Sequence, residues 1–155
     1  ANVTSAGYQV IAAPQDYWYL DHSDNTWIKM YEYDPTIDLD EHARSLIVGG
    51  EASMWGEMVD SDNIHTKIWP TAAAVGERLW SARNHTRTDT MAELSSRVRL
   101  LHGEHGMADV HSRLIASDDR LADANDRILK FRCRMVQRGY GASPIQPGYC
   151  PVEYV

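Results

Sequence analysis

Two short apolar segments constrain the fold of this chain more than any other feature. Residues 7–13, followed by Pro14, and residues 45–48 each have the length and side chains of a buried strand. Both runs are largely apolar, as in parallel strands that are covered on both faces. Because two strands cannot form a stable sheet alone, either further strands lie in the connecting segments or the chain is the end of a larger domain. The apolar pattern favours the second alternative.

The rest of the chain is expected to form long connections and helices, in the order of an α/β unit. A polar and aromatic connection spans residues 15–42, and connections of this length inside a compact domain usually serve a function. Residues 69–80 are predicted to be a helix, because a proline near the start precedes an alanine run. A capping box at residues 90–93 predicts a second helix. A third helix is predicted from Ser117, as its N-cap, to Gly139.

Composition excludes several classes of function. The chain has 155 residues, of which 43% are hydrophobic and 24% charged, values typical of a globular protein. Its net charge of -7 argues against nucleic acid or an anionic membrane surface as the main partner. No apolar run approaches the roughly 20 residues that a transmembrane helix needs. We therefore expect neither a nucleic-acid partner nor a membrane span.

Two cysteines and two sequons bear on the compartment. Cys133 and Cys150 allow a single pairing, although two free thiols are equally compatible with their number. Asn2 and Asn84 each begin an N-x-[ST] triplet, the glycosylation acceptor pattern of secreted or lumenal proteins. Taken together, these features favour an oxidising compartment.

The segment after the second strand carries side chains suited to a sugar. Two glycines, Gly49 and Gly50, allow the backbone to turn or to approach another group closely. Trp55 and Glu57 follow within a few residues, and an indole can stack on the apolar face of a sugar while carboxylates bind its hydroxyls. The alternative is a buried tryptophan beside solvated carboxylates. These residues alone leave both interpretations open.

Five stretches of the chain, in this order, resemble one known family. They are Ala13-Pro14 with Trp18-Tyr19-Leu20-Asp21; Gly49-Gly50-Glu51-Ala52 with Trp55-Gly56-Glu57; Trp69-Pro70; the run 74–81 (AVGERLWS); and Arg132-Cys133-Arg134-Met135-Val136 with Arg138-Gly139 and Gly148-Tyr149-Cys150. The chain resembles the C-terminal part of glycoside hydrolase family 20 β-N-acetylhexosaminidases, close to the lysosomal animal enzymes. The resemblance implies the last two strands and following helices of a (β/α)8 TIM barrel. Active sites of this fold lie at the C-terminal ends of the strands.

The resemblance also implies a mechanism. In this family the substrate's 2-acetamido oxygen attacks the anomeric carbon, with retention of configuration. A glutamate protonates the leaving oxygen, and the aspartate before it orients the acetamido nitrogen. That pair lies in an H-x-G-G-D-E sequence, which this chain lacks. Asp40-Glu41 has no neighbouring glycines, and we interpret it as the first turn of a solvated helix. We therefore expect this chain to be inactive without the upstream part of the barrel.

Four side chains are expected to build half of a sugar pocket. By resemblance, Tyr19 matches the tyrosine whose hydroxyl binds the acetamido oxygen and positions it for attack. Asp21 matches a carboxylate that binds the outer hydroxyls near O4 or O6. Trp55 matches the indole beneath the pyranose ring, and Glu57 matches the carboxylate on its O4 and O6 side.

Three neighbouring residues are assigned around this pocket. Trp18 is expected to line it as well, and Glu51 is expected to be a structural carboxylate, salt-bridged within the barrel. His22 is assigned to substrate binding, at a position that is Leu or Arg in relatives. The Arg type, with Asn before it, accepts 6-sulfated sugars. Because Asp21 is anionic here, we expect a 6-sulfated substrate to bind poorly.

Residues 85–119 are expected to form a helical insertion, because the relatives join the flanking helices by a short connection. His102 and His105 within it are spaced i, i+3, and His111 follows. Exposed histidines are far commoner than metal sites, so we expect no metal and no cofactor.

The leading hypothesis is an exo-β-N-acetylhexosaminidase, which removes terminal β-linked N-acetylglucosamine or N-acetylgalactosamine from glycans. The alternatives are a non-catalytic carbohydrate-binding module and a purely structural piece. The resemblance further implies a dimer, a lysosomal or secreted location, and a disulfide between Cys133 and Cys150 that pins the C-terminal tail onto the last helix.

Overall fold

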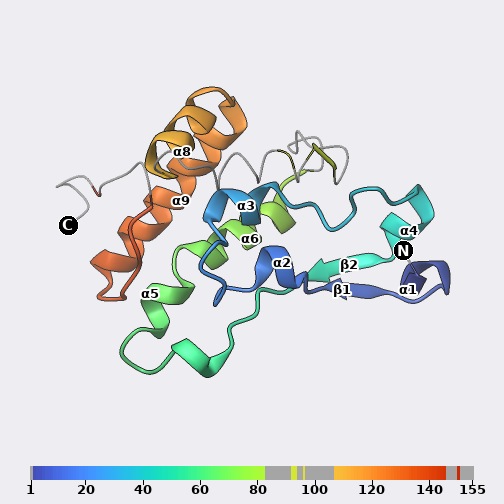
Figure 1. Cartoon of the computed structure of the whole chain (residues 1–155), viewed down its shortest axis with the longest axis horizontal. Helices are drawn as coiled ribbons and strands as arrows, with labels where there is room; N and C mark the ends of the chain where they lie inside the picture. The colour runs from blue at the N-terminus through green and yellow to red at the C-terminus, as the bar shows by residue number, and fades with distance from the viewer. Residues whose placement is uncertain (1, 83–91, 94–95, 97–106, 146–149, 151–155) are drawn as a thin grey trace.

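The sheet of this protein pairs two short parallel strands. The computed structural model describes residues 2–82, 92–93, 96, 107–145 and 150. Strand β1 (Val10–Ala12) lies beside β2 (Ile47–Gly50) (Figure 1). Val10 pairs with Ile47, whereas Ala12 pairs with Gly50, so the register shifts along the sheet. The parallel pairing is confirmed, and the strand positions are confirmed in part. β1 occupies only three residues of the predicted range 7–13. β2 begins two residues after the predicted start, because Ser45 ends a helix, and it continues through both glycines.

Within the described residues one face of the sheet is uncovered, so its burial as part of a larger domain stays a prediction. Ile11 is 63% exposed and Val48 is 54% exposed. Successive side chains of a strand point to opposite faces. Val10 and Ala12 are therefore turned toward the helices and are partly buried, while the face that carries Ile11 is covered by no described element.

The connection between the strands is helical and forms much of the core. It contains α2 (Gln15–Trp18), α3 (Trp27–Glu32) and α4 (Glu41–Ser45), whereas the sequence suggested an irregular segment. The side chains of Trp18, Ile28 and Met30 have no exposed surface. The indole Nε1 of Trp18 donates a hydrogen bond to the carbonyl oxygen of Met30 at 3.1 Å, which joins α2 to α3.

Asp40 and Glu41 lie at the start of α4, as predicted. The Asp40 carboxylate accepts a hydrogen bond from the backbone N–H of Ala43 at 2.8 Å and caps the helix. Both acidic side chains are exposed. This dipeptide is therefore a helix N-terminus in solvent.

The predicted helix after β2 is confirmed as α6 (Thr71–Trp80), with Pro70 at the N-cap position. It follows the 3-10 helix η1 (Gly56–Met58) and the short helix α5 (Ile64–Ile68). Helix α6 packs against α3 and buries Ala74, Val75 and Arg78. The Arg78 guanidinium lies over the Tyr31 ring and donates hydrogen bonds to the carbonyl oxygens of Ser81 and Ala82, at the C-terminal end of α6.

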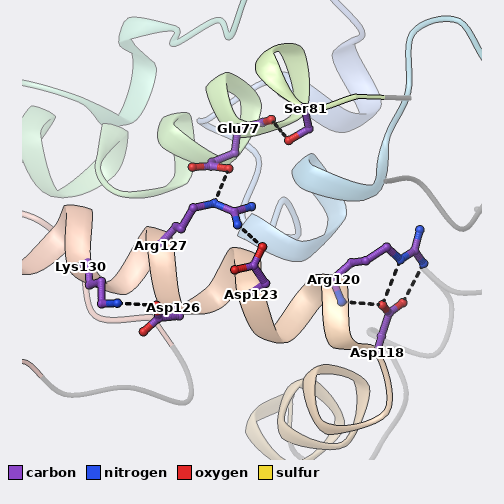
Figure 2. Close-up of polar contacts among 8 residues, drawn as sticks. All are labelled: Glu77, Ser81, Asp118, Arg120, Asp123, Asp126, Arg127 and Lys130. Carbon is purple, nitrogen blue, oxygen red and sulfur yellow. Dashed lines mark hydrogen bonds and ion pairs between the residues drawn. The ribbon is translucent and has the colours of Figure 1, made fainter. Parts of the chain in front are cut away.

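The C-terminal helices α8 (Met107–Ala116) and α9 (Asp119–Gln137) lie at the opposite end of the molecule from α1 (Asn2–Ser5) and α4 (Figure 1). The N-cap of α9 is Asp118, one residue after the predicted Ser117. Figure 2 shows how α9 meets α6: Arg127 Nε donates to Glu77 Oε2 at 2.9 Å. Helix α8 falls within the predicted insertion. The first two residues of the predicted capping box, Thr90 and Met91, lie outside the described residues, as do His102 and His105.

The predicted disulfide is present between Cys133 of α9 and Cys150. The segment after α9 is also held by hydrogen bonds. Ser143 N–H donates to the carbonyl oxygen of Trp69 at 2.8 Å, and its hydroxyl donates to that of Thr66 at 2.7 Å. The tail is thereby tied both to α9 and to the turn between α5 and α6.

The approach of Trp18 to Gly50 can be tested. A Cβ at Gly50 would lie 2.3 Å from Cζ3 of Trp18. We expect Gly50→Ala to destabilise the protein by about 1–3 kcal/mol, because the methyl group displaces a buried indole. Gly49→Ala is the matched control, since a Cβ there would meet no atom within 4 Å. Thermal unfolding measures both variants, and equal midpoints would contradict the expected clash.

Candidate functional site

The site lies beyond the C-terminal ends of β1 and β2, where their following segments remain paired. Tyr19 forms an isolated parallel bridge with Ser53. Leu20 N–H donates to the carbonyl oxygen of Ser53 at 2.8 Å, and Ser53 N–H donates to that of Trp18 at 3.0 Å. These bonds hold the segment after β1 against the segment after β2. Side chains that are more than thirty positions apart in the sequence are thereby brought together.

An open pocket of about 320 Å³ lies between these two segments. The side chains that line it are Gln15, Tyr19, Asp21, His22, Trp55 and Glu57. All but one of the residues predicted for substrate binding or catalysis therefore share one pocket. The Tyr19 ring lies 6.4 Å from the Trp55 ring and 5.7 Å from the His22 ring, measured between centroids.

The lining combines aromatic surface with hydrogen-bond acceptors. Trp55 is 54% exposed, so its indole can be contacted by a ligand. Asp21 is partly buried, and its Oδ1 is buried without a hydrogen-bond partner among the described residues. A buried carboxylate oxygen gains from accepting a hydrogen bond. Because neither Lys nor Arg lines the pocket and Glu57 adds a second carboxylate, the pocket disfavours an anionic ligand and suits hydrogen-bond donors such as hydroxyl groups.

Trp18 is the predicted pocket residue that the structure places elsewhere. Its side chain is completely buried in the core, against Gly50 and hydrogen-bonded to Met30. It therefore has no exposed surface for a ligand. The expectation that it lines the pocket is corrected: Trp18 and Tyr19 are adjacent in the sequence, but Trp18 packs in the core and Tyr19 lines the pocket.

Two residues of the site were missed in the sequence. Gln15 lines the pocket from the first turn of α2, a segment taken for a loop. Asn25 is buried, and its Nδ2 donates to the carbonyl oxygen of Tyr19 at 2.7 Å. This bond closes the loop that carries Asp21 and His22. A helical reading of residues 15–18 would have placed Gln15 on the same face as Tyr19.

Comparison with known proteins decides the family. The family model described as glycosyl hydrolase family 20, catalytic domain, matches residues 1–83. The chain belongs to glycosyl hydrolase family 20. Its membership implies a TIM-barrel family, of which the described residues show two parallel strands with their helices.

Relatives of this family 20 chain match it along nearly its whole length. It is 36% identical to the beta-hexosaminidase subunit beta of Homo sapiens over 99% of this chain, and 36% identical to that of Felis catus over 98%. It is 30% identical to the beta-hexosaminidase subunit B1 of Dictyostelium discoideum over 93% of this chain. The chain spans only about a fifth of the length of these relatives, between 20% and 23%.

The remaining predicted residues of the family 20 chain bear less on the pocket. Glu51 is exposed and makes no ion pair within the part of the chain that the structure describes, so its expected salt bridge within the barrel stays a prediction. Asn2 begins α1, and Asn84 lies outside the described residues.

Within the described ranges, no group of three or more His, Cys, Asp and Glu is placed to hold a metal ion. The same ranges contain no helix with the length and apolarity to cross a membrane.

A larger pocket, of about 470 Å³, lies between α6 and α9. Trp69, Trp80 and Phe131 contribute aromatic surface to it, and its charged groups, Glu77 and Arg127, are bonded to each other (Figure 2). None of the predicted site residues lies there. The smaller pocket therefore remains the candidate site of this family 20 chain, because its carboxylates are free to bind a ligand.

The role of Asn25 can be measured by hydrogen exchange. We expect Asn25→Ala to speed exchange of the Leu20 and Asn25 backbone amides about tenfold, because the loss of one buried hydrogen bond costs roughly 1–2 kcal/mol of local stability. Ser23→Ala, an exposed change in the same loop, is the control and should leave exchange unchanged. Exchange that is the same in both variants would show that Asn25 does not hold this loop.

Proposed function

We propose that this chain forms part of the catalytic domain of an exo-β-N-acetylhexosaminidase. The full-length enzyme would hydrolyse terminal, non-reducing β-linked N-acetylglucosamine or N-acetylgalactosamine from glycans. One observation carries this proposal: Tyr19, Asp21, Trp55 and Glu57 line a single pocket beyond the ends of two parallel strands. The relatives at 30–36% identity, which are named beta-hexosaminidase subunits, support it.

Within that reaction, the residues of this chain bind and orient the sugar. The indole of Trp55 stacks on the apolar face of the pyranose ring. Asp21 and Glu57 accept hydrogen bonds from the sugar hydroxyls on the O4 and O6 side. The Tyr19 hydroxyl donates to the acetamido oxygen and holds it in line with the anomeric carbon, which lowers the entropic part of the barrier.

The proton that cleaves the glycosidic bond comes from outside this chain. The Asp40-Glu41 pair is exposed at the N-terminus of α4 and cannot serve the pocket as acid. In the proposed substrate-assisted mechanism, the acetamido oxygen forms the bond to the anomeric carbon as the leaving oxygen departs. An upstream glutamate protonates that oxygen, and the aspartate before it stabilises the acetamido N–H. The chain by itself is therefore proposed to be inactive.

In the full-length enzyme, β1 and β2 would be the seventh and eighth strands of the barrel. The exposure of Ile11 and Val48 supports this arrangement, because inward-facing side chains of barrel strands pack against those of the other strands. The region 85–119 would then be a helical insertion on the outside of the barrel, to which α8 belongs.

The disulfide and the two sequons support a protein of the secretory pathway, in the lysosome or outside the cell. We further propose a dimer, as the resemblance implied. A carbohydrate-binding module without catalytic activity would use the same pocket. It would differ from the enzyme in binding N-acetylglucosamine without hydrolysing any N-acetylhexosaminide.

Tyr19→Phe tests the catalytic role of the pocket. In the full-length enzyme, acting on an aryl β-N-acetylglucosaminide, we expect kcat to fall about 100-fold with a smaller change in KM, because the lost hydroxyl positions the nucleophile. Tyr8→Phe, at an exposed tyrosine outside the pocket, is the control. Unchanged kcat in Tyr19→Phe would remove Tyr19 from the mechanism. A wild-type protein that binds the sugar but never hydrolyses it would establish the binding module instead.

The carboxylates of the pocket predict discrimination against charged sugars. We expect the wild-type enzyme to have at least a tenfold lower kcat/KM for a 6-sulfated than for a neutral N-acetylglucosaminide, since Asp21 repels the sulfate. Asp21→Asn should raise the ratio of sulfated to neutral turnover. Glu51→Gln removes an exposed carboxylate outside the pocket and should leave the ratio unchanged. Comparable wild-type turnover of both substrates at about pH 5 would refute this prediction.

A further inference from the structure

Gln15 lies in the lining of the candidate site, although the family resemblance assigned it no role. Helix α2 begins at Gln15, and Tyr19 is its C-cap residue. Residues four positions apart on a helix lie on the same face. Gln15 and Tyr19 both line the pocket, so one face of this short helix is turned toward the pocket.

Two further side chains of α2 anchor the helix in the protein core. Trp18 is fully buried and bonded to the Met30 carbonyl oxygen. The Tyr17 ring stacks on the Tyr33 ring, with 4.4 Å between their centroids. These contacts hold α2 against the core. The backbone of Gln15 is therefore held in place, and its exposed side chain starts from a defined position in the pocket lining.

A neutral hydrogen-bond donor would complement the two carboxylates of the pocket. Asp21 and Glu57, when ionised, only accept hydrogen bonds. A sugar hydroxyl that donates its proton to one of them keeps an oxygen that can accept a further bond. The carboxamide of Gln15 supplies two N–H groups without any charge. Its place in the lining thus complements the two carboxylates.

We propose that Gln15 is a substrate-binding residue, whose carboxamide donates a hydrogen bond to an oxygen of the bound sugar. This inference rests on the proposed function, because it assigns a further contact to the same pocket. It adds a determinant of affinity that lies in the segment before the Trp18-Tyr19-Leu20-Asp21 motif.

Two substitutions at one position separate hydrogen bonding from the filling of space. In the full-length enzyme, with a neutral aryl β-N-acetylglucosaminide, we expect Gln15→Ala to raise KM about three- to tenfold with little change in kcat. Gln15→Glu keeps the size of the side chain, removes both N–H groups and adds a third carboxylate. It should raise KM at least as much. Asp16→Ala, an exposed change in the same turn of α2 outside the pocket lining, is the matched control and should leave KM unchanged.

Each other outcome overturns the inference. A wild-type KM in Gln15→Ala or in Gln15→Glu would show that the carboxamide donates no bond to the substrate. An equal rise in KM for Asp16→Ala would show that the changes act through the stability of α2. Failure of the proposed function would give a different result from failure of this inference, because the wild-type enzyme would then hydrolyse no N-acetylhexosaminide. In that case, equal affinity of wild type and Gln15→Ala for N-acetylglucosamine, measured by calorimetry, would overturn this inference as well.

Discussion

The contact between the Trp18 indole and the bare backbone of Gly50 is the constraint on which the rest of this structure depends. The indole occupies the space that any side chain at Gly50 would fill. Its N–H reaches the Met30 carbonyl group, so one side chain joins α2, α3 and β2. Packing at this density leaves α2 a single position over the end of the sheet. The position of Tyr19 in the pocket is fixed as well, because Tyr19 follows Trp18 directly in the sequence.

The backbone pairing beyond the strands has an equally direct effect on the site. Parallel strands bring their C-terminal ends to the same edge of a sheet, and here the Tyr19 and Ser53 segments continue that pairing after β1 and β2 have ended. The site therefore depends on main-chain hydrogen bonds between two loops. These bonds place a phenol and an indole from distant parts of the chain within 6.4 Å of each other.

The parts of the fold that could be predicted from sequence depend on local patterns. The apolar runs located both strands, and the alanine run located α6. The motif around Tyr19 and the motif around Trp55 predicted residues that do share a pocket. In each case a short stretch carries the information, either through periodicity or through a resemblance that spans neighbouring residues.

The remaining features depend on tertiary packing, which no local pattern reveals. Residues 27–32 look like part of a polar connection, yet they form a buried helix because α6 covers them. The direction of Trp18 is set by the absence of a side chain more than thirty residues later, at Gly50. The place of Gln15 in the pocket could not be predicted either, because α2 is too short to show a helical period in the sequence. An apolar run likewise does not reveal what covers it, and the described residues leave the face that carries Ile11 uncovered.

The two-stranded sheet has a consequence for the association of this chain with other chains. In the described structure each strand pairs along one edge only, and the apolar side chains of Ile11 and Val48 stand beside the unpaired backbone groups. Such edges accept further strands from any neighbour, including copies of the same chain. A polypeptide with this surface uncovered is prone to pair with other chains. Covering the sheet thus keeps the chain apart from its neighbours and also stabilises the sheet, because two strands alone are marginal.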